Sequence, residues 1–150
     1  MEKIVAISDT HGDELFLTIP KCDILIHAGD FHITTLEELE YTNRWFEKQP
    51  AKYKILIAGN HDEFLEKYNN HLIREVLTNV IYLKDSYVTL NELKIYGTPW
   101  SPMFNNWYFM RDSDFLKRQW QKIPEDTDIL ITHTPPFGIL DHKIKPNGEI

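Results

Sequence analysis

Short apolar runs recur along the chain, and polar segments separate them. Their length of four to six residues and their richness in Ile and Val predict β-strands rather than helices. The runs are KIVAI at 3–7, DILIHA at 23–28, KILIA at 54–58, VIYL at 80–83, YVTL at 87–90, KIYG at 94–97 and DILIT at 128–132. The first three and the last are apolar on both faces, which is typical of central strands covered on both sides.

Helical spacing of apolar residues marks three segments between these runs. The first begins at a capping-box pattern of Thr35 and Glu38, the second covers 62–78 with an interruption near YNNH, and the third begins at Ser113. The three runs between 80 and 97 are joined by short connections and predict an antiparallel meander. The predicted fold class is therefore α/β, with a mostly parallel core and an antiparallel portion.

The composition is that of one soluble globular domain. Its 150 residues can bury a core without disulfides, and Cys22 is the single cysteine. The net charge of −7 disfavours nucleic acid and anionic membranes as partners. No apolar run is long enough for a signal peptide or a membrane span. We therefore expect a single domain at 1–150, in the cytoplasm, without membrane or nucleic-acid partners.

Polar side chains follow each of the four doubly apolar runs. They are Asp9 and His11, then Asp30, then Asn60, His61 and Asp62, and finally His133. If the strands are parallel, their carboxyl ends lie along one edge of the sheet, where α/β folds bind ligands. Carboxylate, amide and imidazole donors suit Mn, Fe, Zn or Ni, and one aspartate can bridge two ions. The alternative is ordinary turn chemistry of Asp and Asn, which has to explain four coincident strand ends.

Four blocks carry a resemblance to a known family. SDTHG at 8–12, HAGDFH at 27–32, AGNHD at 58–62 and ITHTPP at 131–136 resemble, in this order, the signature blocks of the calcineurin-like metallophosphoesterase superfamily. YGTPWSP and THTPPFGILD are similar to its small metallophosphoesterase-domain-containing branch. The resemblance extends from about Ile4 to Asp141. It implies a four-layer αββα sandwich of mixed β-sheets flanked by helices.

The resemblance also implies roles for single residues. The implied metal ligands are Asp9, His11 and Asp30 for a first ion, and Asp30, Asn60 and His133 for a second, with Asp30 bridging. A hydroxide that bridges the two ions would attack phosphorus. His61 would contact the phosphoryl oxygens and protonate the leaving group, and Asp62 stands where it could orient His61. Mn is the preferred metal, with Fe, Zn, Ni and Mg as alternatives.

The implied activity is that of a metal-dependent phosphoric ester hydrolase, with a phosphodiesterase favoured over a monoesterase. The substrate would be a small phosphoester such as a cyclic nucleotide. The rival hypothesis is a catalytically weak or inactive scaffold of the same fold that binds a protein partner. The two hypotheses differ in whether the protein holds metal and turns over substrate.

The family pattern continues to a Gly-x-His segment that the printed sequence lacks. The single histidine after His133 is His142, in LDHKIK, and it does not match that pattern. The domain is therefore expected to be incomplete at its C-terminal side, either as a fragment or with a weakened site. Loss of the following strands would expose a sheet edge, which a homodimer could cover.

The stretch YGTPWSPMFNNWYF at 96–109 holds six of the 19 aromatic residues. In one interpretation it forms a pocket wall that stacks a nucleobase or aryl leaving group, with Trp100 and Phe104 facing the substrate. In the other, the rings anchor a long loop to the core. His32 is predicted either to line the pocket or to lie in solvent. His27, inside its strand, is predicted to be a buried residue that supports the core or a ligand.

Overall fold

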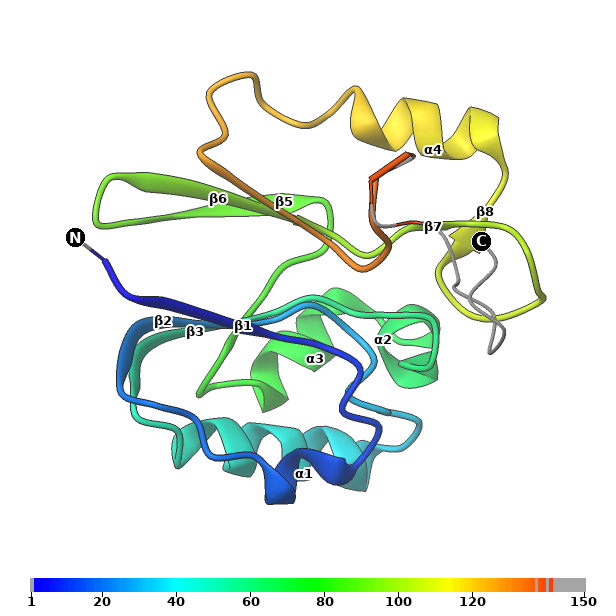
Figure 1. The fold of residues 1–150 in the computed structure, drawn as a ribbon. Helices are drawn as coiled ribbons and strands as arrows, with labels where there is room; N and C mark the ends of the chain where they lie inside the picture. The colour runs from blue at the N-terminus through cyan, green and yellow to red at the C-terminus, as the bar shows by residue number, and fades with distance from the viewer. Residues whose placement is uncertain (1, 137, 140, 142–150) are drawn as a thin grey trace, which may run out of the picture.

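Two β-sheets face each other at the centre of the computed structural model, which describes residues 2–136, 138, 139 and 141 (Figure 1). The first sheet has the order β1-β2-β3-β4, and all its strands are parallel. The second has the order β5-β6-β9, with β5 antiparallel and β9 parallel to β6. The strands are β1 (Ile4–Ile7), β2 (Cys22–His27), β3 (Ala51–Leu56), β4 (Ile81–Tyr82), β5 (Ser86–Leu90), β6 (Leu93–Thr98) and β9 (Ile129–Thr132), with a short parallel pair β7 (Ser101–Pro102) and β8 (Met110–Arg111).

The helices lie outside the two sheets. They are the 3-10 helix η1 (Asp13–Phe16) and the α-helices α1 (Leu36–Glu47), α2 (Glu63–Lys67), α3 (Asn70–Val76) and α4 (Ser113–Trp120). Helices α1 and α3 cover the outer side of the first sheet, and α4 lies beyond the second (Figure 1). Among the residues that the structure describes, no helix combines the length and apolar character needed to span a bilayer.

The predicted helix boundaries are confirmed where local capping sets them. The Thr35 hydroxyl accepts the Glu38 N–H at 3.2 Å, and the Glu38 carboxylate accepts the Thr35 N–H at 3.0 Å. The region 62–78 divides into α2 and α3, as its interruption predicts. Asp112 caps α4 by accepting the N–H of Phe115 at 2.8 Å.

Side-chain alternation along the strands builds two cores. In β2, Leu25 joins the core under α1 and α3, while Ile24 and Ile26 join the core between the two sheets. Ile95 of β6 and Ile131 of β9 reach the same inter-sheet core from the opposite side. The predicted α/β class, with parallel and mixed sheets flanked by helices, is confirmed.

Two predictions about the strands are wrong. The run at 80–83 does not open a meander, because β4 pairs in parallel with β3 in the first sheet and only β5 and β6 form an antiparallel pair. The strands β1 and β9 are not central, because each lies at an edge of its sheet and Ile4 and Leu130 remain partly exposed. An apolar run indicates that a strand can be buried. The place of that strand in the sheet depends on partners far away in sequence.

Candidate metal centre

The loops after β1 and β2 run side by side and place the first predicted ligands. The N–H of Asp9 donates to the Gly29 carbonyl at 3.0 Å, and the N–H of His11 donates to the Asp30 carbonyl at 3.1 Å. Asp9, His11 and Asp30 all have left-handed backbone conformations, with φ of 55°, 48° and 58°. Their ligand atoms lie within 4.8 Å of one another, so the three side chains form one candidate metal-binding group.

The Asp30 carboxylate lies between two histidines. Its Oδ2 is 3.5 Å from His11 Nε2, and its Oδ1 is 3.5 Å from His133 Nε2. Oδ1 also accepts the backbone N–H of His61 at 2.8 Å. Asp30 is only 2% exposed, and these contacts hold its carboxylate with one oxygen toward each histidine.

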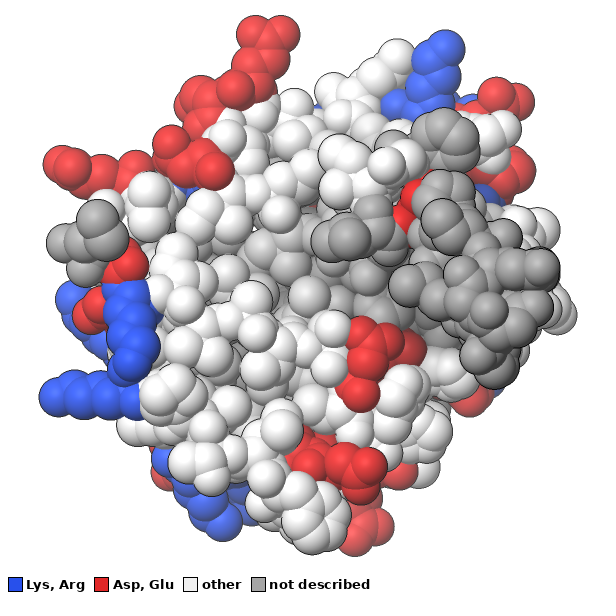
Figure 2. All heavy atoms as spheres, in the orientation of Figure 1, with Lys and Arg blue, Asp and Glu red and all other residues white. Residues whose placement is uncertain are grey.

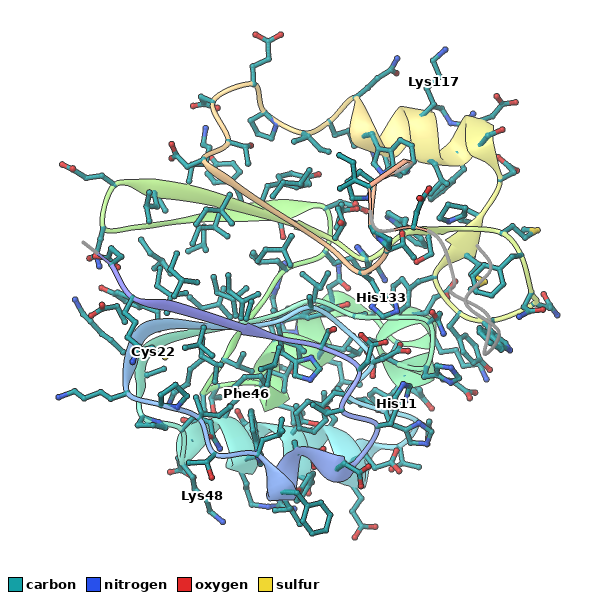
Figure 3. All side chains as sticks on the ribbon, viewed as in Figure 1. His11, Cys22, Phe46, Lys48, Lys117 and His133 are labelled. Atoms are coloured by element: carbon teal, nitrogen blue, oxygen red, sulfur yellow. The ribbon has the colours of Figure 1, made fainter. Side chains whose placement is uncertain are left out.

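The fourth strand end comes from the other sheet. The prediction placed all four strand ends at one sheet edge, but β9 belongs to the second sheet, and His133 reaches the strand ends of the first sheet across the gap. Figure 3 shows His11 and His133 at the same end of the molecule. The His133 Nδ1 lies 2.9 Å from the Ala28 carbonyl, which can only accept, so Nδ1 carries the proton.

This tautomer turns the other ring nitrogen toward oxygen atoms. His133 Nε2 lies 3.1 Å from Asn60 Oδ1 and 3.5 Å from Asp30 Oδ1. A neutral ring would direct a lone pair at the Asp30 carboxylate oxygen, so the geometry favours a positive charge here, either a proton on Nε2 or a cation. The donor set of imidazole, carboxylate and amide oxygen suits a divalent cation.

The pKa values of Asp30 and His133 shift in opposite directions, and each shift favours the charged form of its group. Burial raises the pKa of Asp30, but the interaction with His133 and the hydrogen bond from the His61 N–H outweigh burial and hold that pKa below its ordinary value. Burial lowers the pKa of His133, but the Asp30 carboxylate outweighs it, so this pKa is raised. The surroundings therefore stabilise negative charge on Asp30 and positive charge beside it.

Asp62 is placed differently from its predicted role. It is fully buried, and its two oxygens accept four backbone N–H groups, those of Asp30, His32, Ile33 and Gly59, at 2.8 to 3.0 Å. Among the hydrogen bonds of the described residues, none joins its carboxylate to the His61 ring. The Asp62 carboxylate instead links the loop after β2 to the loop after β3. The geometry therefore indicates a structural role for Asp62.

The aromatic stretch divides into buried and exposed rings. Trp100 is 8% exposed, and its Nε1 donates to Asp85 Oδ2 at 2.7 Å, so it anchors the loop while one side lines a cavity of about 620 Å³. Phe104 lines the same cavity and is largely exposed. Sequence reasoning missed Trp107, whose ring centroid lies 5.0 Å from that of His61 and 5.4 Å from that of Phe104. Its position in the aromatic stretch was the one available signal.

The remaining histidines fall into three environments. His27 is fully buried, with Nε2 3.0 Å from the Thr10 hydroxyl, and burial lowers its pKa to about 3. His32 is exposed beside the candidate metal ligands, and its ring centroid is 6.3 Å from that of His11. His71 is exposed and pairs with Glu75, while His142 lies outside the described residues.

Comparison with protein families agrees with this geometry. A family model described as calcineurin-like phosphoesterase matches residues 2–147, which is nearly the whole chain. The chain belongs to the calcineurin-like phosphoesterases. As a calcineurin-like phosphoesterase it carries candidate metal-binding groups of His and Asp side chains that follow β1, β2 and β3.

Several curated proteins are similar to this calcineurin-like phosphoesterase. Metallophosphoesterase domain-containing protein 1 of Homo sapiens is 41% identical over 165 residues, covering 93% of this chain and 50% of the relative. The mouse protein of the same name gives the same values. A UPF0046 protein of Caenorhabditis elegans is 37% identical over 153 residues, covering 93% of this chain and 53% of the relative. The chain thus spans about half the length of the curated relatives it matches.

Proposed function

We propose that this chain carries a two-metal phosphoesterase centre and hydrolyses a phosphodiester. The observation that carries the proposal is the position of Asp30, whose buried carboxylate directs one oxygen toward His11 and the other toward His133. A carboxylate placed in this way can serve two ions at once. The helix, sheet, sheet, helix order of layers in Figure 1 supports the αββα sandwich that the family implies.

The described residues fit two divalent cations. Asp9 and His11 with one oxygen of Asp30 would hold the first, and Asn60 and His133 with the other oxygen would hold the second. The mixture of oxygen and imidazole donors favours Mn, with Fe, Zn, Ni and Mg as alternatives. When bound, such ions supply a water of lowered pKa and neutralise the charge of the phosphoryl group.

The side chains around this centre have separate tasks. The His61 ring lies 5.0 Å from the His11 ring, so it can reach a phosphoryl group at the centre and give a proton to the leaving oxygen. Its backbone N–H meanwhile holds Asp30 in place. The bond between His133 Nδ1 and the Ala28 carbonyl fixes the ring so that Nε2 faces the centre.

The choice of a diester rests on the exposed aromatic side chains. Trp107 and Phe104 lie edge to face, and Trp107 reaches His61. A flat surface beside the phosphoryl position favours a substrate with a nucleobase or aryl group, such as a cyclic nucleotide. On the face shown in Figure 2, Lys and Arg side chains are scattered rather than gathered in one patch, which favours a small substrate over a polyanion.

The rival proposal, a scaffold that binds a protein partner, makes the opposite prediction about metal. We expect the purified chain with Mn²⁺ to hydrolyse bis-p-nitrophenyl phosphate, and Asp30→Asn to lose both the activity and the bound metal, measured by elemental analysis. Asp114→Asn, at an exposed position in the first turn of α4, is the matched control and should retain both. Wild-type protein that neither binds Mn²⁺ nor turns over substrate would establish the scaffold.

A further inference from the structure

Three imidazole rings meet beside the proposed metal pair. His11, His32 and His61 follow β1, β2 and β3, and their ligand nitrogens all lie within 4.8 Å of one another. The ring centroids are 5.0 Å apart for His11 and His61, 6.3 Å for His11 and His32, and 6.4 Å for His32 and His61. This group, the imidazole triad, contains no carboxylate, unlike the neighbouring group of Asp9, His11 and Asp30.

The backbone holds His32 in a costly conformation that brings its ring to this place. Its φ is 77°, in the left-handed region that residues with a Cβ seldom adopt. The buried Asp62 stabilises it by accepting the His32 N–H at 2.8 Å and the next N–H, of Ile33, at 3.0 Å. A strained conformation that several bonds enforce is a feature of functional sites.

The donor chemistry of the triad differs from that of the metal pair. Three neutral imidazoles are an established zinc set, whereas carboxylates favour harder ions such as Mn²⁺. Zinc–nitrogen bonds of about 2.0–2.1 Å in a tetrahedral arrangement place the nitrogens about 3.3 Å apart. The triad therefore closes on one ion through side-chain movements on the order of 1.5 Å, which the exposure of His11 and His32 permits.

His11 is common to the two groups. One imidazole nitrogen binds one ion at a time. In His11, Nε2 is the nitrogen that lies 3.5 Å from Asp30 Oδ2. We propose that the imidazole triad is a separate site for one Zn²⁺ ion, and that an ion there takes His11 away from Asp9 and Asp30. Zinc at this site also occupies His61. The regulatory half of this inference, inhibition of hydrolysis by zinc, rests on the proposed function, while the zinc site itself does not.

Anomalous diffraction tests the site directly. Crystals of the metal-free protein are soaked with Zn²⁺, and data are collected on both sides of the zinc edge. We expect an anomalous peak within bonding distance of one nitrogen each of His11, His32 and His61. Zinc peaks solely at the Asp30-centred positions would overturn the proposal, whether or not the protein proves to be a phosphoesterase.

Metal affinities test the competition for His11. In calorimetric titrations of the metal-free protein, His32→Ala should weaken the Zn²⁺ site at least tenfold and leave Mn²⁺ affinity within about twofold. Asp9→Asn should weaken Mn²⁺ binding and spare this Zn²⁺ site. His71→Ala removes an exposed histidine of α3 and is the matched control, with both affinities unchanged. Equal losses of Zn²⁺ and Mn²⁺ affinity in His32→Ala would show that His32 merely supports the metal pair.

The two proposals fail in different ways. Wild-type protein that binds Zn²⁺ through His32 but never hydrolyses a phosphodiester with Mn²⁺ would contradict the proposed function and keep the zinc site. For Mn²⁺-loaded protein, the Mn²⁺ signal in electron paramagnetic resonance reports displacement without turnover. We expect added Zn²⁺ to release Mn²⁺ at lower concentrations from the wild type than from His32→Ala. The same release curve for both proteins would exclude competition at His11.

Discussion

At the scale of single residues, backbone conformation distinguishes the site. Eight non-glycine residues that the structure describes have positive φ, and four of them, Asp9, His11, Asp30 and His32, lie in the two loops after β1 and β2. Asp and His tolerate the left-handed region better than most residues, and hydrogen bonds between the loops enforce it. The conformation of these two loops therefore determines where the candidate site's side chains lie.

The role of His61 can be separated from metal binding. His61→Ala keeps the backbone N–H that holds Asp30, so metal content should stay at the wild-type level while turnover falls by about 10²–10⁴-fold. Loss of a proton donor matters most for a poor leaving group. The fall in kcat should therefore be larger for a phenyl diester than for a p-nitrophenyl diester. Equal losses for the two substrates, or loss of metal, would contradict the assignment.

His27 predicts a pH dependence of stability. Its folded pKa of about 3 lies below the ordinary value of 6.5, because burial disfavours the charged ring. Below about pH 6, His27 binds a proton in the unfolded chain but stays neutral in the folded protein. The free energy of unfolding therefore falls with falling pH, by about 1.4 kcal/mol per pH unit. His27→Gln keeps a polar partner for Thr10 but removes this titration.

The measurement is chemical denaturation of the metal-free wild type and variant between about pH 6 and pH 4. Other groups titrate in both proteins, so the difference between the two free energies of unfolding isolates His27. As the pH falls, the free energy of unfolding of the wild type should decrease relative to that of His27→Gln. Parallel curves would show that His27 is protonated in the folded protein.

The sequence indicates where the candidate ligands lie along the chain but not which groups support them. Asp9, Asp30, Asn60 and His133 each follow directly after an apolar run, so local order along the chain predicts where they lie. Backbone N–H groups from two loops donate hydrogen bonds to Asp62, and Trp107 contacts His61. Both features depend on how loops distant in sequence fold against each other. No pattern within either loop carries that information.

At the scale of elements, the sequence predicted the parallel pairing of β1, β2 and β3 and the local helix signals, but not the places of β4 and β9 in the sheets. The capping box of α1 is complete within four residues, so its sequence determines it. The pairing of β4 with β3 depends instead on the crossover through α2 and α3, and the run at 80–83 looks the same in either sheet. The same reason explains why β9 could not be assigned to the second sheet in advance.

Two glycines where elements approach closely provide a matched pair of variants. A Cβ on Gly59 would meet the Asp30 backbone N at 2.5 Å and His133 Cε1 at 2.7 Å, at the metal centre. A Cβ on Gly97 would meet Leu83 Cβ at 2.6 Å and Ile57 Cγ2 at 2.7 Å, in the core between the sheets. Substitution by alanine therefore adds the same methyl group at two sites with different roles.

We expect Gly59→Ala to weaken Mn²⁺ binding by more than tenfold, because Asp30 and His133 must move. Gly97→Ala should cost roughly 1–3 kcal/mol of stability through overpacking and leave Mn²⁺ affinity unchanged. Calorimetry with Mn²⁺ and denaturant unfolding of both variants check the two effects. A large loss of metal affinity in Gly97→Ala would show that the site and the inter-sheet core are mechanically coupled.

At the scale of the whole molecule, the centre joins the two sheets. His133 extends from β9 of the second sheet, and its ring contacts Ala28 and Asn60, which follow β2 and β3 of the first. The ions proposed to bind here would bind the folded protein and would have no matching site in the unfolded chain. Metal binding should therefore stabilise the sheets against each other as well as the loops.

This linkage can be measured through His133. With free Mn²⁺ at 100 times its dissociation constant, a single bound ion adds about 2.7 kcal/mol to the free energy of unfolding. His133→Ala removes a proposed ligand of the second ion and the contact between the sheets, so its gain in stability on adding Mn²⁺ should be smaller than that of the wild type. His71→Ala, at an exposed histidine of α3, should show the full gain.

Hydrogen exchange should slow on Mn²⁺ addition in β9 as well as in the loop after β3. If β9 exchanges at the same rate with and without Mn²⁺, the ions organise the loops of the first sheet alone and do not join the two sheets.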